Sequence, residues 1–358
     1  MTTPTGQISL DDVNIELSIA PGTQITMNQP DVRGLAEVPT GQISMSNLQG
    51  KSNAQFLSAS GGTISTVGDY KIHVFNSSGT FTVNAAGNPA GSDSVDYLVI
   101  AGGGSGGGGG NSVSQGGGGG GAGGFRESVP APAAWTASPL ANPGGAVPVS
   151  VQAYPITVGG GGAGVAPIAK GDNGSPSIFS TITSAGGGGG GGGELNRAGA
   201  KSGGCGGGAG NRNSTGYTGV AGSAGNTPPV SPPQGQPGGG SGIGGSASNP
   251  GGGGGGSGQA GAGDINGGVV GVGGNGSTTS ITNSPVTYAG GGAGGQWSNQ
   301  ATIPGGTGGG GPNTYRVAND GTANLGGGGA ASDRYILTPA NVSGAGGSGK
   351  VVLRYKFQ

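Results

Sequence analysis

Apolar and polar positions follow a period of two in several stretches, and this pattern predicts β-strands. Residues 70–75 and 80–83 are rich in β-branched and aromatic side chains, and the turn-forming segment 76–79 between them predicts a hairpin. Residues 95–100 form a nearly continuous apolar run, which is typical of a strand buried on both faces. In 351–357 the apolar positions alternate with Arg and Lys, which predicts a strand with one buried face. We expect this last strand to pair near 95–100 and close a β-sandwich.

A different pattern fills the first 53 residues. A four-residue motif of the type Gln-Ile-Ser/Thr-apolar occurs three times, at spacings of 17 and 18 residues. The pairs Ser9–Asp12 and Thr26–Gln29 resemble capping boxes, so the repeat predicts three short helical turns. Glycines are expected to end these turns, at Gly22, Gly34 and Gly50. Such a unit buries little apolar surface alone, so we expect it to dock on another protein through its apolar motif residues, which are Ile8, Leu10, Ile25, Met27, Ile43 and Met45.

Glycine dominates the long middle of the chain. The sequence has 97 glycines and 23 prolines among 358 residues, and uninterrupted runs include 106–110, 116–121, 186–193 and 251–256. Disorder is the ordinary interpretation of such a composition. However, short β-like segments interrupt the runs, at 154–158, 177–183 and 285–288, and charge is too sparse for a solvated coil.

An ordered alternative is a set of extended helices with three residues per turn, whose N–H and C=O groups all point outward. Such polyglycine II helices would pack in a lattice and bond to each other on all sides. Collagen is excluded because glycine does not recur at every third position. The sequence therefore predicts a mainly β fold in three parts. These are an N-terminal docking segment with short helical turns at 1–53, a β-sandwich at 54–101 plus 350–358, and a polyglycine II lattice insertion at 102–349.

Chemically versatile side chains are rare. The chain has one histidine, His73, one cysteine, Cys205, and 27 charged residues (13 basic and 14 acidic). Catalysis needs a poised acid, base or nucleophile with a partner, and a His/Cys metal site needs three or four ligands. We expect no enzyme activity, no cofactor and no metal site. We interpret His73 as a packed strand residue and Cys205 as a small filler, and the close acidic pairs Asp93/Asp96 and Asp320/Asp333 do not make a catalytic dyad.

Other partners are argued against by charge and hydropathy. The net charge of −1 gives no basic stripe for nucleic acid. No apolar run is long enough to span a membrane, and no signal peptide is visible. The phosphate-loop-like stretch 344–350 is followed by Val351 where a Ser or Thr would be needed for magnesium, so we discount it.

The order of four segments resembles a glycine-rich domain common in phage and prophage tail proteins. An apolar strand runs into glycines at 95–104, a Tyr-x-Ile-Thr-Val-Gly segment lies at 154–159, a Ser-x-Phe segment leads to a glycine run at 177–186, and Gly-Ser-Gly precedes an Arg-Tyr strand at 347–355. The resemblance covers roughly residues 70–358. The segment 31–52 is similar to a leader found in many phage tail fibre proteins. Related glycine lattices occur in distal adhesins of T-even-like phages and in an extracellular receptor kinase region, but the latter is disulfide-bonded, which a single cysteine argues against.

The resemblance implies a virion tail fibre or fibre-tip adhesin, made in the bacterial host cytoplasm. It would bind other tail proteins through its N-terminus and a host glycan or outer-membrane protein through loops of the glycine-rich region. Trimers are usual for such fibres. Candidate receptor-binding residues are the aromatic residues Trp135, Tyr217, Trp297 and Tyr315. Two alternatives stay open: a purely structural tail or collar connector without receptor contact, and an ice-binding polyglycine protein, although no regular Thr or Ala array is present.

Overall fold

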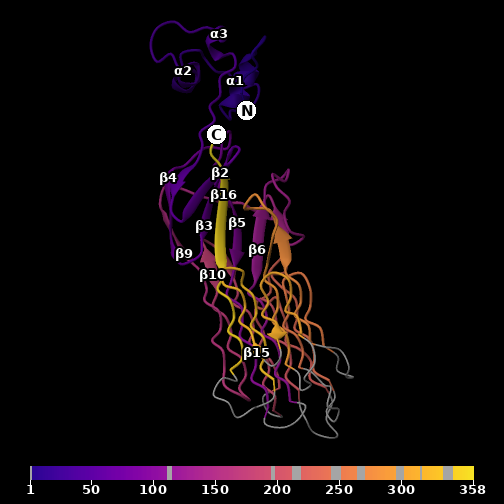
Figure 1. Cartoon of the computed structure of the whole chain (residues 1–358). Helices are drawn as coiled ribbons and strands as arrows, with labels where there is room; N and C mark the ends of the chain where they lie inside the picture. Colours follow the sequence, from indigo (N-terminus) through magenta and orange to yellow (C-terminus); the bar gives the residue numbers. More distant parts are fainter. Residues whose placement is uncertain are drawn as a thin grey trace.

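The computed structural model describes residues 2–110, 115–194, 198–211, 219–242, 251–263, 271–295, 302–314, 317–333 and 342–358. The molecule is elongated (Figure 1). A small helical unit lies at one end, two β-sheets follow, and glycine-rich segments run side by side away from the sheets. The C-terminal strand β16 returns through the sheets, so both chain ends lie toward the helical end.

The N-terminal unit contains the three predicted helical turns. They are α1 (Leu10–Glu16), α2 (Pro30–Ala36) and α3 (Met45–Leu48). Their apolar faces meet in a separate small core around Val13, Val32 and Leu48, each of which is fully buried. We define these helices and their connections, residues 2–53, as the N-terminal unit.

One predicted helix end is confirmed, and two others differ from the prediction. The Ser9–Asp12 capping box caps α1 as predicted, because each side chain bonds to the other residue's backbone. The Thr26–Gln29 pair does not start a helix: the Thr26 N–H donates to Gln29 Oε1 at 2.9 Å, but α2 begins only at Pro30, which favours the first turn because it lacks an N–H. Gly34 lies inside α2, and the residue that terminates the helix after Ala36 is Glu37, in the left-handed conformation.

The larger sheet has seven strands. Its main order is β2 (Thr63–Val67), β3 (Tyr70–Phe75), β16 (Lys350–Lys356), β5 (Ser94–Ile100), β6 (Phe125–Val129) and β7 (Ala141–Pro143), with β8 (Val147–Pro148) also paired to β5. The pairing of the last strand with 95–100 is confirmed, because Lys350 lies opposite Ile100 and Arg354 opposite Asp96. The strand β5 is buried on both faces, also as predicted.

The second sheet has five strands. Its order is β1 (Ser58–Ser60), β4 (Gly79–Ala85), β9 (Ala153–Thr157), β10 (Ser177–Phe179) and β11 (Ile182–Ser184). Two further two-stranded ladders pair β12 (Ser277–Thr279) with β13 (Val286–Tyr288) and β14 (Asn313–Thr314) with β15 (Val317–Ala318).

The two sheets pack face to face around one apolar core. Phe75 of one sheet and Phe81 of the other share this core with Tyr355 and Phe179. The predicted hairpin of 70–75 with 80–83 is therefore wrong: β3 and β4 belong to different sheets, and the exposed turn 76–78 passes from one sheet to the other. Both strands bury one aromatic face, and stacking these faces across the core covers them better than side-by-side pairing would.

His73 contributes to this packing. It is fully buried, its ring stacks on Tyr355 with centroids 5.5 Å apart, and Phe81 meets it edge-on at 5.1 Å. Burial lowers the pKa of His73. The interpretation of His73 as a packed strand residue is confirmed.

Strands from inside the range 102–349 also build the sheets, although we expected that whole range to form the glycine-rich insertion. Their aromatic residues Tyr154 and Phe179 fill the core between the sheets. The segment 177–183, expected as one strand, is the hairpin β10–β11, with Ser180 at φ 52° in its turn. The last strand is buried on both faces rather than one, because Val352 and Arg354 are covered by a second cluster that includes Ile281 and Tyr288.

Candidate functional site

The glycine-rich runs are joined by backbone hydrogen bonds that repeat every third residue. In the run 115–124, Gly118, Gly121 and Gly124 donate to the segment 185–191, each at 2.8 Å. Gly119 and Ala122 donate to 252 and 255, at 2.9 Å. The third set, Gly117, Gly120 and Gly123, donates to 332, 329 and 326. Successive N–H groups therefore point in three directions, and every third one returns to the same neighbour.

Carbonyl groups of this run point to three further neighbours. Those of 118 and 121 accept from the segment 102–110, those of 119 and 122 from 198–211, and those of 117 and 120 from 289–295. Three neighbours that accept and three that donate make six segments around one central run, counting only the parts of the chain that the structure describes. We call these hydrogen-bonded runs within 102–349 the glycine-rich network. Backbone bonds hold it together where an ordinary domain would have an apolar core.

Close approach of the backbones explains why these positions are glycine. A Cβ placed on Gly118 would lie 1.9 Å from the carbonyl oxygen of Gly208, and one on Gly190 would lie 1.9 Å from that of Gly118. Real contacts of a Cβ are essentially never closer than 3.0 Å. Cys205 is fully buried within the network, and burial raises the pKa of its thiol to about 12, so it is an inert filler as predicted.

The predicted receptor-binding aromatics are placed only in part. Trp135 is half-buried against the seven-stranded sheet, with the Arg354 guanidinium 4.4 Å from its ring and Tyr70 edge-on at 6.3 Å. This places its ring within the fold. Tyr217, Trp297 and Tyr315 lie outside the described residues.

A buried polar cluster that we did not predict from the sequence lies on the outer face of the seven-stranded sheet. Asp96 on β5 and Arg354 on β16 lie directly opposite each other and are 7% and 4% exposed. Ser128 Oγ donates to Asp96 Oδ1 at 2.7 Å, and Arg354 Nη1 donates to the Ile281 carbonyl at 2.9 Å. Glu127 is buried beside them and accepts hydrogen bonds from Thr279 Oγ1 and the Ser138 N–H. The sequence did hold a signal for this cluster. Two apolar strands that were expected to pair contain charges of opposite sign, Asp96 in one and Arg354 in the other.

Burial raises the pKa of Asp96 to about 6, while the Ser128 hydrogen bond and the Arg354 charge oppose that rise. The pKa of Glu127 is also raised by burial. Raised carboxyl pKa values also occur in active sites. Here the carboxylates accept hydrogen bonds from strands and turns of the fold, and the bonds of Glu127 with Thr279 and of Arg354 with the Ile281 carbonyl connect the segment 277–281 to the sheet. Of the other acidic residues, Asp320 Oδ1 accepts from the Ala345 N–H at 2.7 Å, and Asp333 Oδ1 accepts from Asn313 Nδ2 at 2.8 Å.

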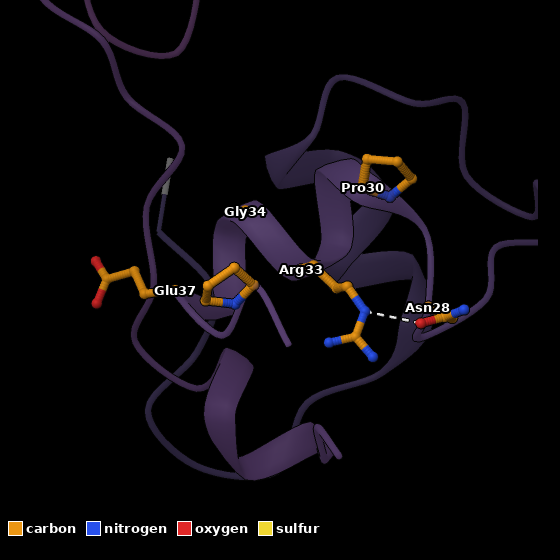
Figure 2. Close-up of a pocket in the computed structure, with 6 residues that line it drawn as sticks. Asn28, Pro30, Arg33, Gly34 and Glu37 are labelled. Carbon is orange, nitrogen blue, oxygen red and sulfur yellow. Dashed lines mark hydrogen bonds between the residues drawn. The ribbon is translucent and has the colours of Figure 1, made fainter. Parts of the chain in front are cut away.

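The N-terminal unit carries an open pocket of about 450 Å³ beside α2 (Figure 2). It is lined by Asn28, Pro30, Arg33, Gly34, Glu37 and Pro39. The Arg33 side chain donates to Asn28 Oδ1 at 2.8 Å and to the carbonyls of Val38 and Gly41 at 3.1 and 2.8 Å. These bonds hold the chain around α2, so this arginine is mainly a structural residue.

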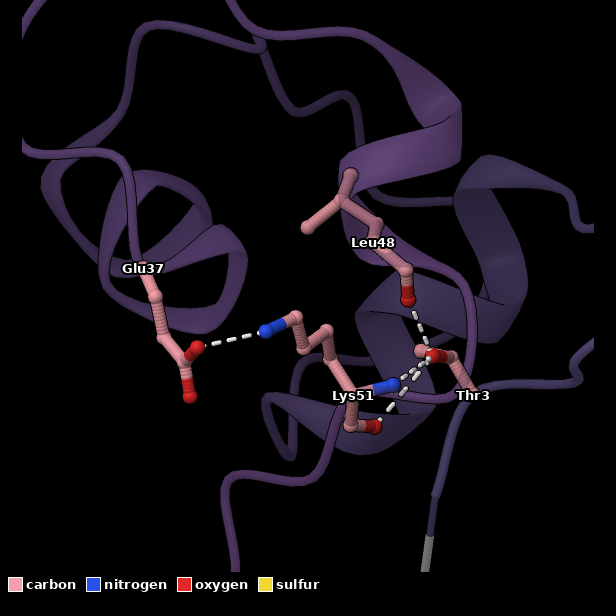
Figure 3. Close-up of polar contacts among 4 residues, drawn as sticks. All are labelled: Thr3, Glu37, Leu48 and Lys51. Carbon is pink, nitrogen blue, oxygen red and sulfur yellow. Dashed lines mark hydrogen bonds and ion pairs between the residues drawn. The ribbon is translucent and has the colours of Figure 1, made fainter.

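The start and the end of the N-terminal unit are tied together (Figure 3). Thr3 is 2% exposed; its hydroxyl donates to the Leu48 carbonyl and accepts from the Lys51 N–H at 2.9 Å. Lys51 Nζ also pairs with Glu37 at 2.5 Å. Five of the six predicted docking residues pack on this unit's own core, whereas the sixth, Leu10, is 43% exposed. Ile15, which was not predicted, is also exposed, at 41%.

We expect Leu48→Ala to unfold the N-terminal unit while leaving the sheets intact. Leu48 is fully buried in that small core, and truncating a buried leucine costs about 2–5 kcal/mol, a large share of what so small a core can supply. Limited proteolysis should cleave the variant within residues 2–53 at protease concentrations that spare the wild type. Near-ultraviolet signals from the aromatic core of the sheets should not change. Loss of both together would show that the two cores are one cooperative unit.

Within the described ranges, no cluster of three or more His, Cys, Asp or Glu residues could hold a metal ion, and no helix has the length and apolar character to cross a membrane. A search of curated proteins finds no match to this chain. A family model described as a glycine-rich domain matches residues 76–356, which include the glycine-rich network and every strand of the two sheets except β1, β2 and β3. The chain therefore belongs to the glycine-rich domain family.

Proposed function

We propose that this protein is a component of a bacteriophage tail, either a fibre or a fibre-tip adhesin, and that it has no enzymatic activity. It would attach to other tail proteins through the N-terminal unit and contact the host surface through the glycine-rich region. The observation that carries the proposal is the separation in Figure 1: the helical unit with its own core lies at one end, and the glycine-rich network extends from the opposite end of the sheets. Such an arrangement suits a part that is held at one end and binds at the other.

We infer that the runs of the network are polyglycine II helices arranged in a lattice. Their hydrogen bonds repeat every third residue, and this is the period of an extended helix with three residues per turn. Six neighbours around the run 115–124 fit a hexagonal arrangement. A lattice of this kind needs no side chains in its interior, so loops that leave it are free to vary without disturbing the scaffold.

Two surfaces are proposed for the two attachments. The exposed apolar residues Leu10 and Ile15 on α1 are the proposed contact with the tail, since their neighbours already fill the unit's own core. Because Trp135 packs against the sheet, the proposed host contacts are the other aromatic candidates, Tyr217, Trp297 and Tyr315. The ligand would be a cell-surface glycan or an outer-membrane protein.

The test measures the two attachments separately. We expect labelled purified chain to bind the host's surface, and Leu48→Ala to keep this binding while losing incorporation into virions. A variant with Tyr217, Trp297 and Tyr315 replaced by alanine should behave in the opposite way. If every variant is incorporated and the wild type binds no host on which the phage grows, the protein is a structural connector without receptor contact.

A further inference from the structure

One strand at the edge of the sheets lacks the usual protection against pairing with another chain. The smaller sheet ends on β1 and β11, which have three residues each, and β1 also carries a register shift at Ser58–Ala59. The larger sheet ends on one side with β7, which has three residues and contains Pro143. On its other side it ends with β2, Thr63–Val67, which has five residues in regular register and no proline or charge. Short length, bulges, proline and charge are the devices that prevent edge pairing, and β2 has none of them.

The side chains of β2 are accessible. The first four of its five residues are exposed, and Ile64 is 46% exposed although it lies opposite His73, on the face that packs against the other sheet. The neighbouring edge strand β1 is joined to β2 by Gly61 and Gly62, and its Ser58 and Ser60 are exposed. Both sheets therefore end at the same side in uncharged strands, and the apolar side chain of Ile64 is incompletely covered there.

We propose that β2 is a self-association edge, at which the β2 strands of two copies of this chain pair antiparallel around a two-fold axis at Ser65. The proposal is independent of the tail assignment, and its two-fold dimer differs from the trimer that the resemblance implies. It joins the two seven-stranded sheets into one continuous sheet across the dimer.

The sequence of β2 is compatible with its own copy in this register. A two-fold axis at Ser65 places Thr63 opposite Val67, Ile64 opposite Thr66, and Ser65 opposite itself. Pairs of β-branched residues are favourable across antiparallel strands, and no like charges meet. The nearest charge, Asp69, falls opposite Gly61. Because β2 carries no charge, it offers no charge complementarity to a partner of different sequence. Pairing with a second copy does not require such complementarity.

Two variants that place opposite charges at position 65 test this register. We expect the wild type to form a dimer that depends on protein concentration, since a single strand edge gives a small interface. Ser65→Lys and Ser65→Asp would each place like charges face to face, and each should weaken self-association at least about tenfold in sedimentation equilibrium. Mixing the two variants should restore dimers that contain one copy of each. This recovery would not occur if residue 65 merely affected folding.

Thr157→Lys is the matched control. Thr157 is exposed on β9, a strand that pairs with β4 on one side and β10 on the other. Thr157→Lys should therefore leave dimerisation unchanged. Circular dichroism confirms that each variant is folded. The proposal is overturned by a wild type that stays monomeric, by Ser65→Lys that associates like the wild type, or by a mixture of the charged variants that fails to recover.

Discussion

Alanine at Gly190 is expected to destabilise the protein by about 3 kcal/mol or more, a large effect for the addition of one methyl group. A Cβ at this position would lie 1.9 Å from the carbonyl oxygen of Gly118, and the atom in the way belongs to a backbone rather than to a flexible side chain. The Gly118 segment cannot move aside freely, because its own N–H donates to Gly191 and its carbonyl accepts from Gly107. Relief of one clash would therefore break bonds to other runs.

The matched control is Gly160→Ala, at a glycine in the run 159–162. Gly160 is exposed, and a Cβ there meets nothing within 4 Å. Alanine at this site should be neutral or stabilising by about 0.4–1 kcal/mol, since it restricts the unfolded chain. Urea unfolding followed by circular dichroism measures both. Equal stabilities for the two variants would mean that the network tolerates side chains. The conclusion that its backbones are too closely packed for a Cβ would then be wrong.

The sequence was a good guide wherever a side-chain pattern specified the structure. The three short helices followed from the repeated motif, and the apolar run of 95–100 identified a doubly buried strand that pairs with the last one. It was a poor guide to which strands share a sheet. The period of two in 70–75 and 80–83 shows one apolar face on each strand, but both side-by-side pairing and stacking across a core satisfy that pattern.

The glycine-rich region shows a different limit. A run such as 186–193 has no side chains, so its sequence carries no information about which neighbour each residue bonds to. That choice depends on the lengths of the connections and on strands such as β9 and β10, which fix the ends of the runs to the sheets. The candidate site was similarly only half visible: Asp96 was noted only as a member of an acidic pair, and its pairing with Arg354 needed the strand register.

Arg354→Met is expected to destabilise the protein by about 3–5 kcal/mol at pH 7.5, because it leaves Asp96 buried without its opposite charge. The guanidinium lies 4.7 Å from the Tyr70 ring and 4.4 Å from that of Trp135, and it donates to the Ile281 carbonyl. Methionine retains much of the apolar volume but none of the charge. The loss of charge compensation should therefore account for most of the effect.

The pH dependence separates the charge from the packing. The pKa of Asp96 is about 6 in the folded protein and 3.8 in its ordinary state, so between these values the folded state holds the proton more tightly. Protonation thus favours folding, and this contribution is lost as pH rises through 6. Without Arg354 the pKa of Asp96 should rise further, so the deficit of Arg354→Met should shrink when unfolding is measured at pH 4.5. Adding Asp96→Asn to Arg354→Met should remove this dependence and recover part of the stability at pH 7.5. A deficit that is the same at both pH values would assign the role of Arg354 to its contacts with Tyr70, Trp135 and Ile281, and not to its charge.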